Sequence, residues 1–239
     1  SLAVLSKPDP DAVRATFTRV AHRYDLANHV LSGGIDFSWR RKLVRLANEG
    51  SCSSILDLAT GSGDVVFALE HGVESSPEII GLDFCEPMLL QARKKRDELK
   101  LNAEKFPFVV GDCLDLPFPD DKFDLVTISF GLRNLADREK GLSEIYRVLK
   151  PGGRLIILEF SQPYQWFRPF YYFYLRLILP WLARIVTGDR KAYLYLGTSI
   201  SNFPNRPELS REMEAIGFKK VVAQALTFSI VSLHHGCKE

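Results

Sequence analysis

The regular alternation of short β-rich runs with segments of helical periodicity constrains the fold of this chain more than any other feature. Apolar, β-rich runs occupy residues 53–58, 78–83, 106–111, 123–130 and 153–160. Between them, apolar side chains recur at three-to-four spacing over residues 64–71, 86–100 and 137–149. Strands that alternate with helices join through right-handed crossovers, so the pattern predicts an α/β fold with a doubly wound, mostly parallel sheet.

Both ends of the chain extend this core. Residues 13–31 and 36–49 have the spacing of N-terminal helices, and residues 207–217 that of a C-terminal helix. The last two β-rich runs, Lys219–Gln224 and Thr227–Leu233, are separated by two residues, which predicts an antiparallel edge on a seven-stranded sheet. Because no repeat or low-complexity linker divides the sequence, we expect a single domain over residues 1–239.

A glycine loop follows the first predicted strand. Gly61 and Gly63 connect that strand to a helix, so a ligand can approach bare backbone and the N–H groups of the helix start. The next strand ends at Asp83, about twenty residues on, where a carboxylate can accept both hydroxyls of a ribose. The two features favour a ribose-containing cofactor, although a tight turn that binds nothing is the alternative. A dinucleotide fingerprint would need a small residue in place of Val66.

Composition excludes several other classes of protein. With 46% hydrophobic residues, 25% charged residues and a net charge of +2, the chain has an ordinary globular composition and no basic tract for nucleic acid. Its four cysteines are far apart and form no Cys-x-x-Cys pair, so we expect neither a disulfide scaffold nor a metal site. A reducing compartment fits this usage, and residues 1–18 lack the apolar stretch of a secretory signal.

Several motifs resemble those of a known enzyme family. Asp57–Asp64, Gly81-Leu82-Asp83 and Gly111-Asp112-Cys113 are similar to three motifs of class I S-adenosylmethionine (SAM) methyltransferases, whose fold is Rossmann-like. More specific stretches resemble the ubiquinone/menaquinone biosynthesis C-methyltransferases (UbiE/MenG type) over residue 13 to the end. These stretches are Tyr24-Asp25-x-x-Asn28, Trp39-Arg40-Arg41, Ser129-Phe130-Gly131-Leu132-Arg133-Asn134, Tyr146-Arg147-Val148-Leu149-Lys150-Pro151-Gly152-Gly153 and Leu158-Glu159-Phe160-Ser161.

The resemblance implies SAM as the cofactor and a set of residues that bind it. Asp83 would take the ribose, the glycine loop the methionine end, and Asp112 with the Cys113 amide the adenine edge. The expected cofactor-binding residues are Gly61, Ser62, Gly63, Asp83, Phe84, Asp112, Cys113 and Ser129. For Asp112 the alternative is a local cap, and for Ser129 a local hydrogen bond. Asp57 is expected to be structural and to anchor loop amides.

Methylation of a ring carbon requires that carbon to be electron-rich. A quinol meets this need when it loses an oxygen-bound proton, so we expect a cation and a base near that oxygen. Arg133 is the predicted cation, with a salt bridge to Asp137 or a bracing of the loop as the alternative. Asp25 and Tyr24 are the predicted catalytic pair on the N-terminal segment, residues 1–50, which we place on the substrate side. His22 and His29 are further candidates for the base.

An aromatic segment is predicted to form a cap-like insertion over residues 161–206. Seven of the nine residues from Trp166 to Tyr174 are aromatic, and arginines and prolines interrupt the apolar run that follows, so the segment is not a transmembrane span. Aromatic residues mixed with arginine are typical of a surface at a membrane boundary. A buried lid helix or a homodimer face is the alternative.

We therefore expect an enzyme, a SAM-dependent C-methyltransferase acting on a polyprenylated quinol, either demethylmenaquinol or the related methoxybenzoquinol. A methyltransferase for another lipid and a non-catalytic, SAM-binding assembly subunit of a quinone pathway are the alternatives. The expected location is the cytoplasm with peripheral membrane contact, or a mitochondrion or plastid if the source is eukaryotic. One departure from the family's usual pattern is Asp36, where a His is common. This departure puts any mechanism that uses that His in doubt.

Overall fold

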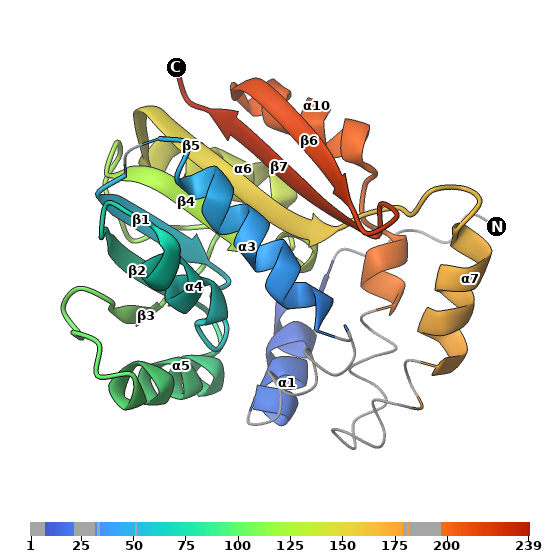
Figure 1. Cartoon of the computed structure of the whole chain (residues 1–239), viewed down its shortest axis with the longest axis horizontal. Coiled ribbons are helices and arrows are strands. Elements are labelled where there is room, and N and C mark those ends of the chain that lie inside the picture. Colours follow the sequence, from blue (N-terminus) through green and yellow to red (C-terminus); the bar gives the residue numbers. More distant parts are fainter. Residues whose placement is uncertain (1–7, 22–31, 33, 51, 179–180, 182–196) are drawn as a thin grey trace.

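A seven-stranded sheet organises the molecule, with strand order β3-β2-β1-β4-β5-β7-β6 (Figure 1). The structure is a computed structural model that describes residues 8–21, 32, 34–50, 52–178, 181 and 197–239. The strands are β1 Ser54–Leu58, β2 Glu78–Asp83, β3 Phe108–Val110, β4 Phe123–Ser129, β5 Leu149–Phe160, β6 Lys219–Leu226 and β7 Val231–Cys237. Strands β1 to β5 run parallel, so their carboxyl ends lie at one edge of the sheet.

Helices cover both faces of this sheet. They are α3 Ile35–Ala47, α4 Asp64–Gly72, α5 Glu86–Glu98, α6 Arg138–Val148 and α10 Arg206–Ile216, whereas α1 Pro10–Val20 lies at the carboxyl edge of the sheet. Shorter elements are the 3-10 turn η2 Leu132–Asn134, the helix α7 Arg168–Phe173 and the π-helical η3 Tyr174–Ile178. In Figure 1, α3 and α4 cross the front of the sheet, whereas α6 and α10 lie behind it.

Alternating side chains of the strands divide the core into two layers. In β1, Ile55 belongs to a cluster with α3, α4 and α5, whereas Leu56 belongs to a second cluster with α6 and α10. Successive side chains of a strand point to opposite faces, so a strand buried on both faces is apolar throughout. The expected α/β, doubly wound, mostly parallel architecture is therefore confirmed.

Two details of the last hairpin differ from the expectation. Strand β7 pairs antiparallel with both β5 and β6, so the antiparallel strand lies one place inside the edge and β6 forms the edge itself. The turn also comes later in the sequence than expected, since β6 continues to Leu226. The turn contains Thr227, Phe228 and Ser229, whose φ angles are 45°, 54° and 65°. Left-handed backbone is uncommon for these residue types, and no glycine or proline marks the turn in the sequence.

No helix in the described part of the chain is long and apolar enough to cross a bilayer.

Candidate functional site

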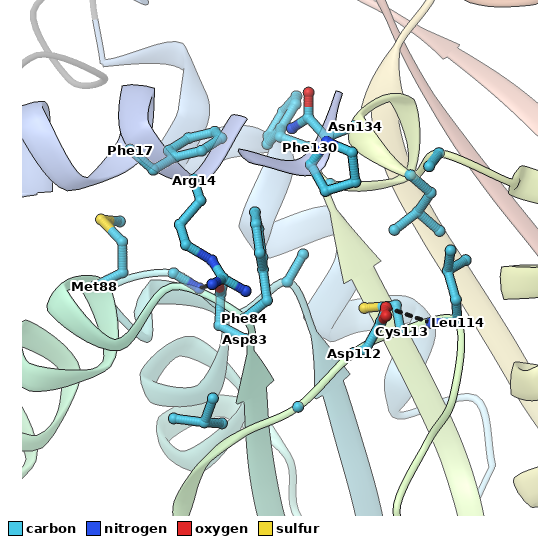
Figure 2. A pocket seen from close by; sticks show the side chains of 18 of the residues that line it. Arg14, Phe17, Asp83, Phe84, Met88, Asp112, Cys113, Leu114, Phe130 and Asn134 are labelled. Carbon is cyan, nitrogen blue, oxygen red and sulfur yellow. Dashed lines mark hydrogen bonds between the residues drawn. The ribbon is translucent and has the colours of Figure 1, made fainter. Parts of the chain in front are cut away.

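A cavity of about 320 Å³ opens where the carboxyl ends of β1, β2 and β4 meet (Figure 2). Its volume is at the lower end of the range of about 300–1,000 Å³ that is typical of small-molecule sites. Of the eight predicted cofactor-binding residues, six line it: Gly61, Asp83, Phe84, Asp112, Cys113 and Ser129. The parallel sheet brings these sequence-distant residues together, since the strands that precede them end at the same edge.

The glycine loop shapes this wall in two ways. Gly61, at φ +55°, lines the cavity, and its N–H donates to Oδ2 of Asp83 at 2.8 Å. Gly63, at φ +87°, is instead the N-cap residue of α4, and a Cβ there would come within 2.9 Å of the Phe67 ring and 3.0 Å of the Phe108 ring. Ser62 is buried and, like Gly63, does not line the cavity. Contact of Ser62 and Gly63 with a cofactor stays a prediction.

Asp83 lies in the cavity wall with both carboxylate oxygens already oriented. Oδ2 accepts from the Gly61 amide, and Oδ1 accepts from the Cys85 amide at 2.9 Å. Burial raises the pKa of the Asp83 carboxyl, while the amides oppose that rise. Each oxygen keeps a second lone pair, so the carboxylate can still accept from the hydroxyls of a ligand.

Asp57 has the structural role expected of it, although its partners are hydroxyls and not loop amides. Oδ1 accepts from the Thr127 hydroxyl and Oδ2 from the Thr60 hydroxyl, both at 2.6 Å. The residue is buried between β1 and β4, and burial raises the pKa of its carboxyl to about 7. Asp57 therefore connects the glycine loop to the neighbouring strand and does not face the cavity.

The loop after β3 supplies a polar edge and an apolar wall. Oδ1 of Asp112 accepts from the Leu114 amide at 2.8 Å, so the local cap weighed as an alternative is present. The same side chain is exposed and lines the cavity, and its other oxygen is available to a ligand. Burial raises the pKa of the Cys113 thiol to about 12, so this cysteine stays protonated and apolar at neutral pH.

Strained backbone lies beside the end of β4. Ala59 and Phe130 line the cavity and have φ angles of 49° and 55°, which cost roughly 1–3 kcal/mol each for residues with a side chain. Gly131 packs so close that an added Cβ would lie 2.3 Å from Cβ of Ala59. Between these residues, the buried Oγ of Ser129 has no hydrogen-bond partner within the described chain. A buried hydroxyl without a partner is a natural contact for a polar ligand atom.

Arg133 does not line the cavity; it lies behind the cavity wall in a buried ion pair. Its Nη1 is 2.9 Å from Oε1 of Glu159 and also donates to the Phe130 carbonyl, and its Nε donates to the Ser199 hydroxyl at 3.2 Å. Of the two alternatives weighed for Arg133, the bracing of the loop is present, because Nη1 donates to the Phe130 carbonyl. The ion pair is with Glu159 and not with Asp137, whose side chain caps α6 by accepting from the Lys140 amide. A direct contact of Arg133 with a substrate stays a prediction.

Helix α1 contributes a part of the site that sequence reasoning missed. Pro10, Arg14 and Phe17 line the cavity, and Figure 2 shows Arg14 reaching from α1 toward Asp83 and Phe84. The Arg14 guanidinium carbon lies 5.3 Å from the centre of the Phe84 ring, within cation–π range. The heptad-like spacing of 10, 14 and 17 was a signal that these residues share one helix face. Nothing in the sequence indicated what that face would cover.

An ion-pair network holds the helix that follows the glycine loop. Asp64, the first residue of α4, pairs with Arg40 at 2.9 Å and with Lys95 at 2.8 Å. Arg40 also pairs with Asp36 at 2.7 Å, and the Ser32 hydroxyl donates to Asp36. The residue that departs from the family pattern, Asp36, is therefore a buried partner of Arg40 within α3, and Arg40 in turn links α3 to α4 through Asp64.

Two of the predicted catalytic residues, Tyr24 and Asp25, lie outside the described residues, as do His22 and His29. Their roles stay predictions.

Comparison with known proteins identifies the family to which the chain belongs. A model of the ubiE/COQ5 methyltransferase family matches residues 6–238. A demethylmenaquinone methyltransferase from Thermus thermophilus is 45% identical over 92% of this chain and 98% of its own length. A ubiquinone/menaquinone biosynthesis C-methyltransferase UbiE from Geotalea daltonii is 40% identical over 95% of this chain and 97% of its own length. Among solved structures, a SAM-dependent methyltransferase from Aquifex aeolicus has the same fold, with a TM-score of 0.56 at 18% identity, covering 77% of this chain and 81% of that one. The chain belongs to the ubiE/COQ5 methyltransferase family.

Proposed function

We propose that this protein is an enzyme that transfers the methyl group of SAM to a ring carbon of a polyprenylated quinol. The observation that carries the proposal is the cavity at the carboxyl edge of the sheet. It joins the buried Asp83 carboxylate, the exposed Asp112 oxygen and the partnerless Ser129 hydroxyl in one wall. Relatives at 45% and 40% identity carry the names of quinone-methylating enzymes, which supports the substrate class.

The residues present fit SAM. Asp83 would accept the ribose hydroxyls, because two backbone amides already fix its orientation. Asp112 would accept from the adenine amino group, and Phe84 and Leu114 would cover the faces of the ring. The buried hydroxyl of Ser129, at the end of β4, would form a hydrogen bond with a polar atom of the cofactor. When bound, SAM supplies an electrophilic methyl group on a sulfonium.

The protein's part in the transfer is to position a carbon nucleophile and to make it electron-rich. Alignment of two reactants in one site removes much of the barrier to an in-line displacement. The remaining need is a deprotonated quinol oxygen, so only the reduced substrate reacts. Arg133 lies one residue before the cavity-lining Asn134 and would stabilise that oxygen with its Nη2, which donates to none of the described residues. Asp25, with Tyr24, is the proposed base.

We further propose that the enzyme acts at a membrane surface, since a polyprenyl tail dissolves in lipid and not in water. The N-terminal segment, residues 1–50, then forms the substrate side, and the aromatic segment within 161–206 forms a cap. Both naphthoquinol and benzoquinol head groups fit this proposal, and so does a homodimer.

The test is an assay of methyl transfer from labelled SAM to demethylmenaquinol and to the methoxybenzoquinol, each with a short tail and kept reduced. We expect labelled product from at least one of them and none from the oxidised quinones. Tight SAM binding without turnover on either quinol would instead favour an assembly subunit. Turnover on oxidised quinone under non-reducing conditions would contradict the carbon-nucleophile mechanism.

A further inference from the structure

Helix α7 and the π-helical turn after it present large apolar side chains to both sides. Tyr171 and Leu175, four residues apart, are buried against the protein. On the other side, Trp166, Phe170, Phe173 and Leu177 recur at helical spacing, and each is more than half exposed. A helix of a globular protein normally turns a polar face to water, whereas this second face is apolar and stays more than half exposed in the described chain.

The stripe continues onto a distant part of the sequence. Phe228, in the turn between β6 and β7, is half exposed, and its ring lies 5.7 Å from Trp166 and 5.0 Å from Phe167. The Tyr164 amide donates to the Phe228 carbonyl at 3.2 Å, which fixes the turn against the start of the segment. We call the five exposed residues Trp166, Phe170, Phe173, Leu177 and Phe228 the aromatic platform. Figure 1 shows α7 at one end of the molecule, opposite β3.

The segment that carries most of the platform has charge of one sign. Between Glu159 and Asp189 the sequence contains no Asp or Glu, whereas it contains Arg168, Arg176 and Arg184. Arg168, in α7, and Arg176, in η3, are exposed on the segment that carries four of the five platform residues. Aromatic rings suit the boundary between headgroups and acyl chains, and arginines beside them attract anionic lipid headgroups.

We propose that the aromatic platform docks on the surface of an anionic lipid bilayer. This inference rests on the proposed function for its biological sense, because docking there brings the enzyme to a quinol dissolved in the same membrane. The charge pattern favours a bilayer over a second copy of this chain, since two such surfaces would bring arginines of the same sign together.

The test is co-sedimentation of the full chain with vesicles of phosphatidylcholine, with and without one-third phosphatidylglycerol. We expect binding to the anionic vesicles that weakens in high salt. Phe170→Ser combined with Phe173→Ser should lower the partition coefficient about tenfold or more, because both side chains are exposed and would enter the bilayer. Leu90→Ser combined with Leu99→Ser is the matched control, since these two apolar side chains are also more than half exposed and lie on the distant α5 side.

A charge series separates headgroup attraction from apolar insertion. Arg168→Glu with Arg176→Glu should abolish the preference for anionic vesicles. Lys42→Glu with Lys219→Glu changes the net charge by the same amount but should leave most of that preference. An equal loss of anionic preference in both double variants would show that net charge alone drives binding and would overturn the proposal that the platform docks. The melting temperature of each variant, measured alongside, distinguishes lost docking from lost folding.

If the aromatic platform binds something other than a bilayer, the same variants give different results. If the phenylalanine pair lowers the oligomer size in sizing chromatography and vesicle binding is absent, the platform is a contact between copies of this chain and the proposal is wrong. If it leaves vesicle binding intact but raises the KM for a long-tailed quinol in detergent, the platform holds the substrate tail, which also overturns docking. A wild-type enzyme that methylates a short-tailed quinol without binding vesicles refutes the docking alone. Vesicle binding without any methylation refutes the proposed function alone.

Discussion

Asp83 is the residue on which the cofactor assignment depends most. Replacing it with Ala removes the acceptor for two ribose hydroxyls, so SAM binding should weaken by about 1.5–3 kcal/mol, roughly 10- to 150-fold. Isothermal calorimetry measures the effect. Because the Gly61 and Cys85 amides lose their acceptor as well, Asp83→Asn serves as the milder companion that keeps one oxygen. A folded Asp83→Ala protein with unchanged affinity would remove the basis for a ribose site.

Arg133 is expected to act on stability and on turnover through different contacts. Arg133→Ala leaves Glu159, which is 0% exposed, as a buried charge without its ion-pair partner. The free energy of unfolding should therefore fall by about 3–5 kcal/mol. Turnover should fall about 10²–10³-fold if the guanidinium stabilises the quinol oxygen. The double variant Arg133→Met with Glu159→Gln removes both charges and should recover much of the stability without the activity. Near wild-type turnover in that double variant would limit Arg133 to a structural role.

At the scale of elements, α1 is expected to strengthen cofactor binding by covering the cavity. Arg14→Ala removes a cation–π contact with Phe84 that is worth about 0.5–1 kcal/mol at an exposed position, so SAM affinity should fall about two- to fivefold. Arg19→Ala, on the same helix but outside the cavity wall, is the matched control. Equal affinities in both variants, measured by calorimetry, would show that α1 does not contact the cofactor.

The strands of the sheet could be predicted because burial on two faces leaves a continuous apolar run, as in Leu155-Ile156-Ile157-Leu158. The residues at strand ends, such as Asp83 and Asp112, could be predicted as well, since parallel strands end at one edge. The turn at Thr227–Ile230 could not be found, because tertiary contacts and not glycine hold its left-handed backbone. Among those contacts, the Trp39 indole donates to the Thr227 hydroxyl at 2.9 Å.

The site was predicted less completely than the fold. Ion-pair partners depend on which buried groups the fold brings together, so Glu159 could not be identified as the partner of Arg133 from local sequence. The cavity-lining role of Arg14 depends on where α1 packs, and its side chain carries no motif. Strain at Ala59 and Phe130 has no sequence signal either, because neither residue type marks a left-handed backbone.

For the whole molecule, Asp57 makes stability depend on pH. Its folded pKa of about 7 lies above the ordinary value of 3.8, so between about pH 4 and 7 the folded protein keeps a proton that the unfolded chain has lost. This contribution is fully present below about pH 4 and is lost as the pH rises through about 7. Asp57→Asn does not titrate and retains an acceptor for one threonine hydroxyl. Its melting temperature should therefore improve relative to wild type as the pH increases.

Thermal melts of both proteins between about pH 5 and pH 8 measure this difference. The buried His234, whose pKa is lowered by burial, titrates in both proteins, so its effect cancels in the comparison. Parallel curves for the two proteins would show that Asp57 does not hold the proton.

The position of β7 also sets the order in which the sheet is completed during synthesis. β7 lies between β5 and β6 but is made after both, so β5 and the side of β6 that faces it leave the ribosome with unpaired backbone groups. An open strand edge of this kind is a template for pairing with other chains. The nascent protein is therefore most at risk of aggregation in the interval before its last strand is inserted, and a chain interrupted in that interval cannot close its own sheet.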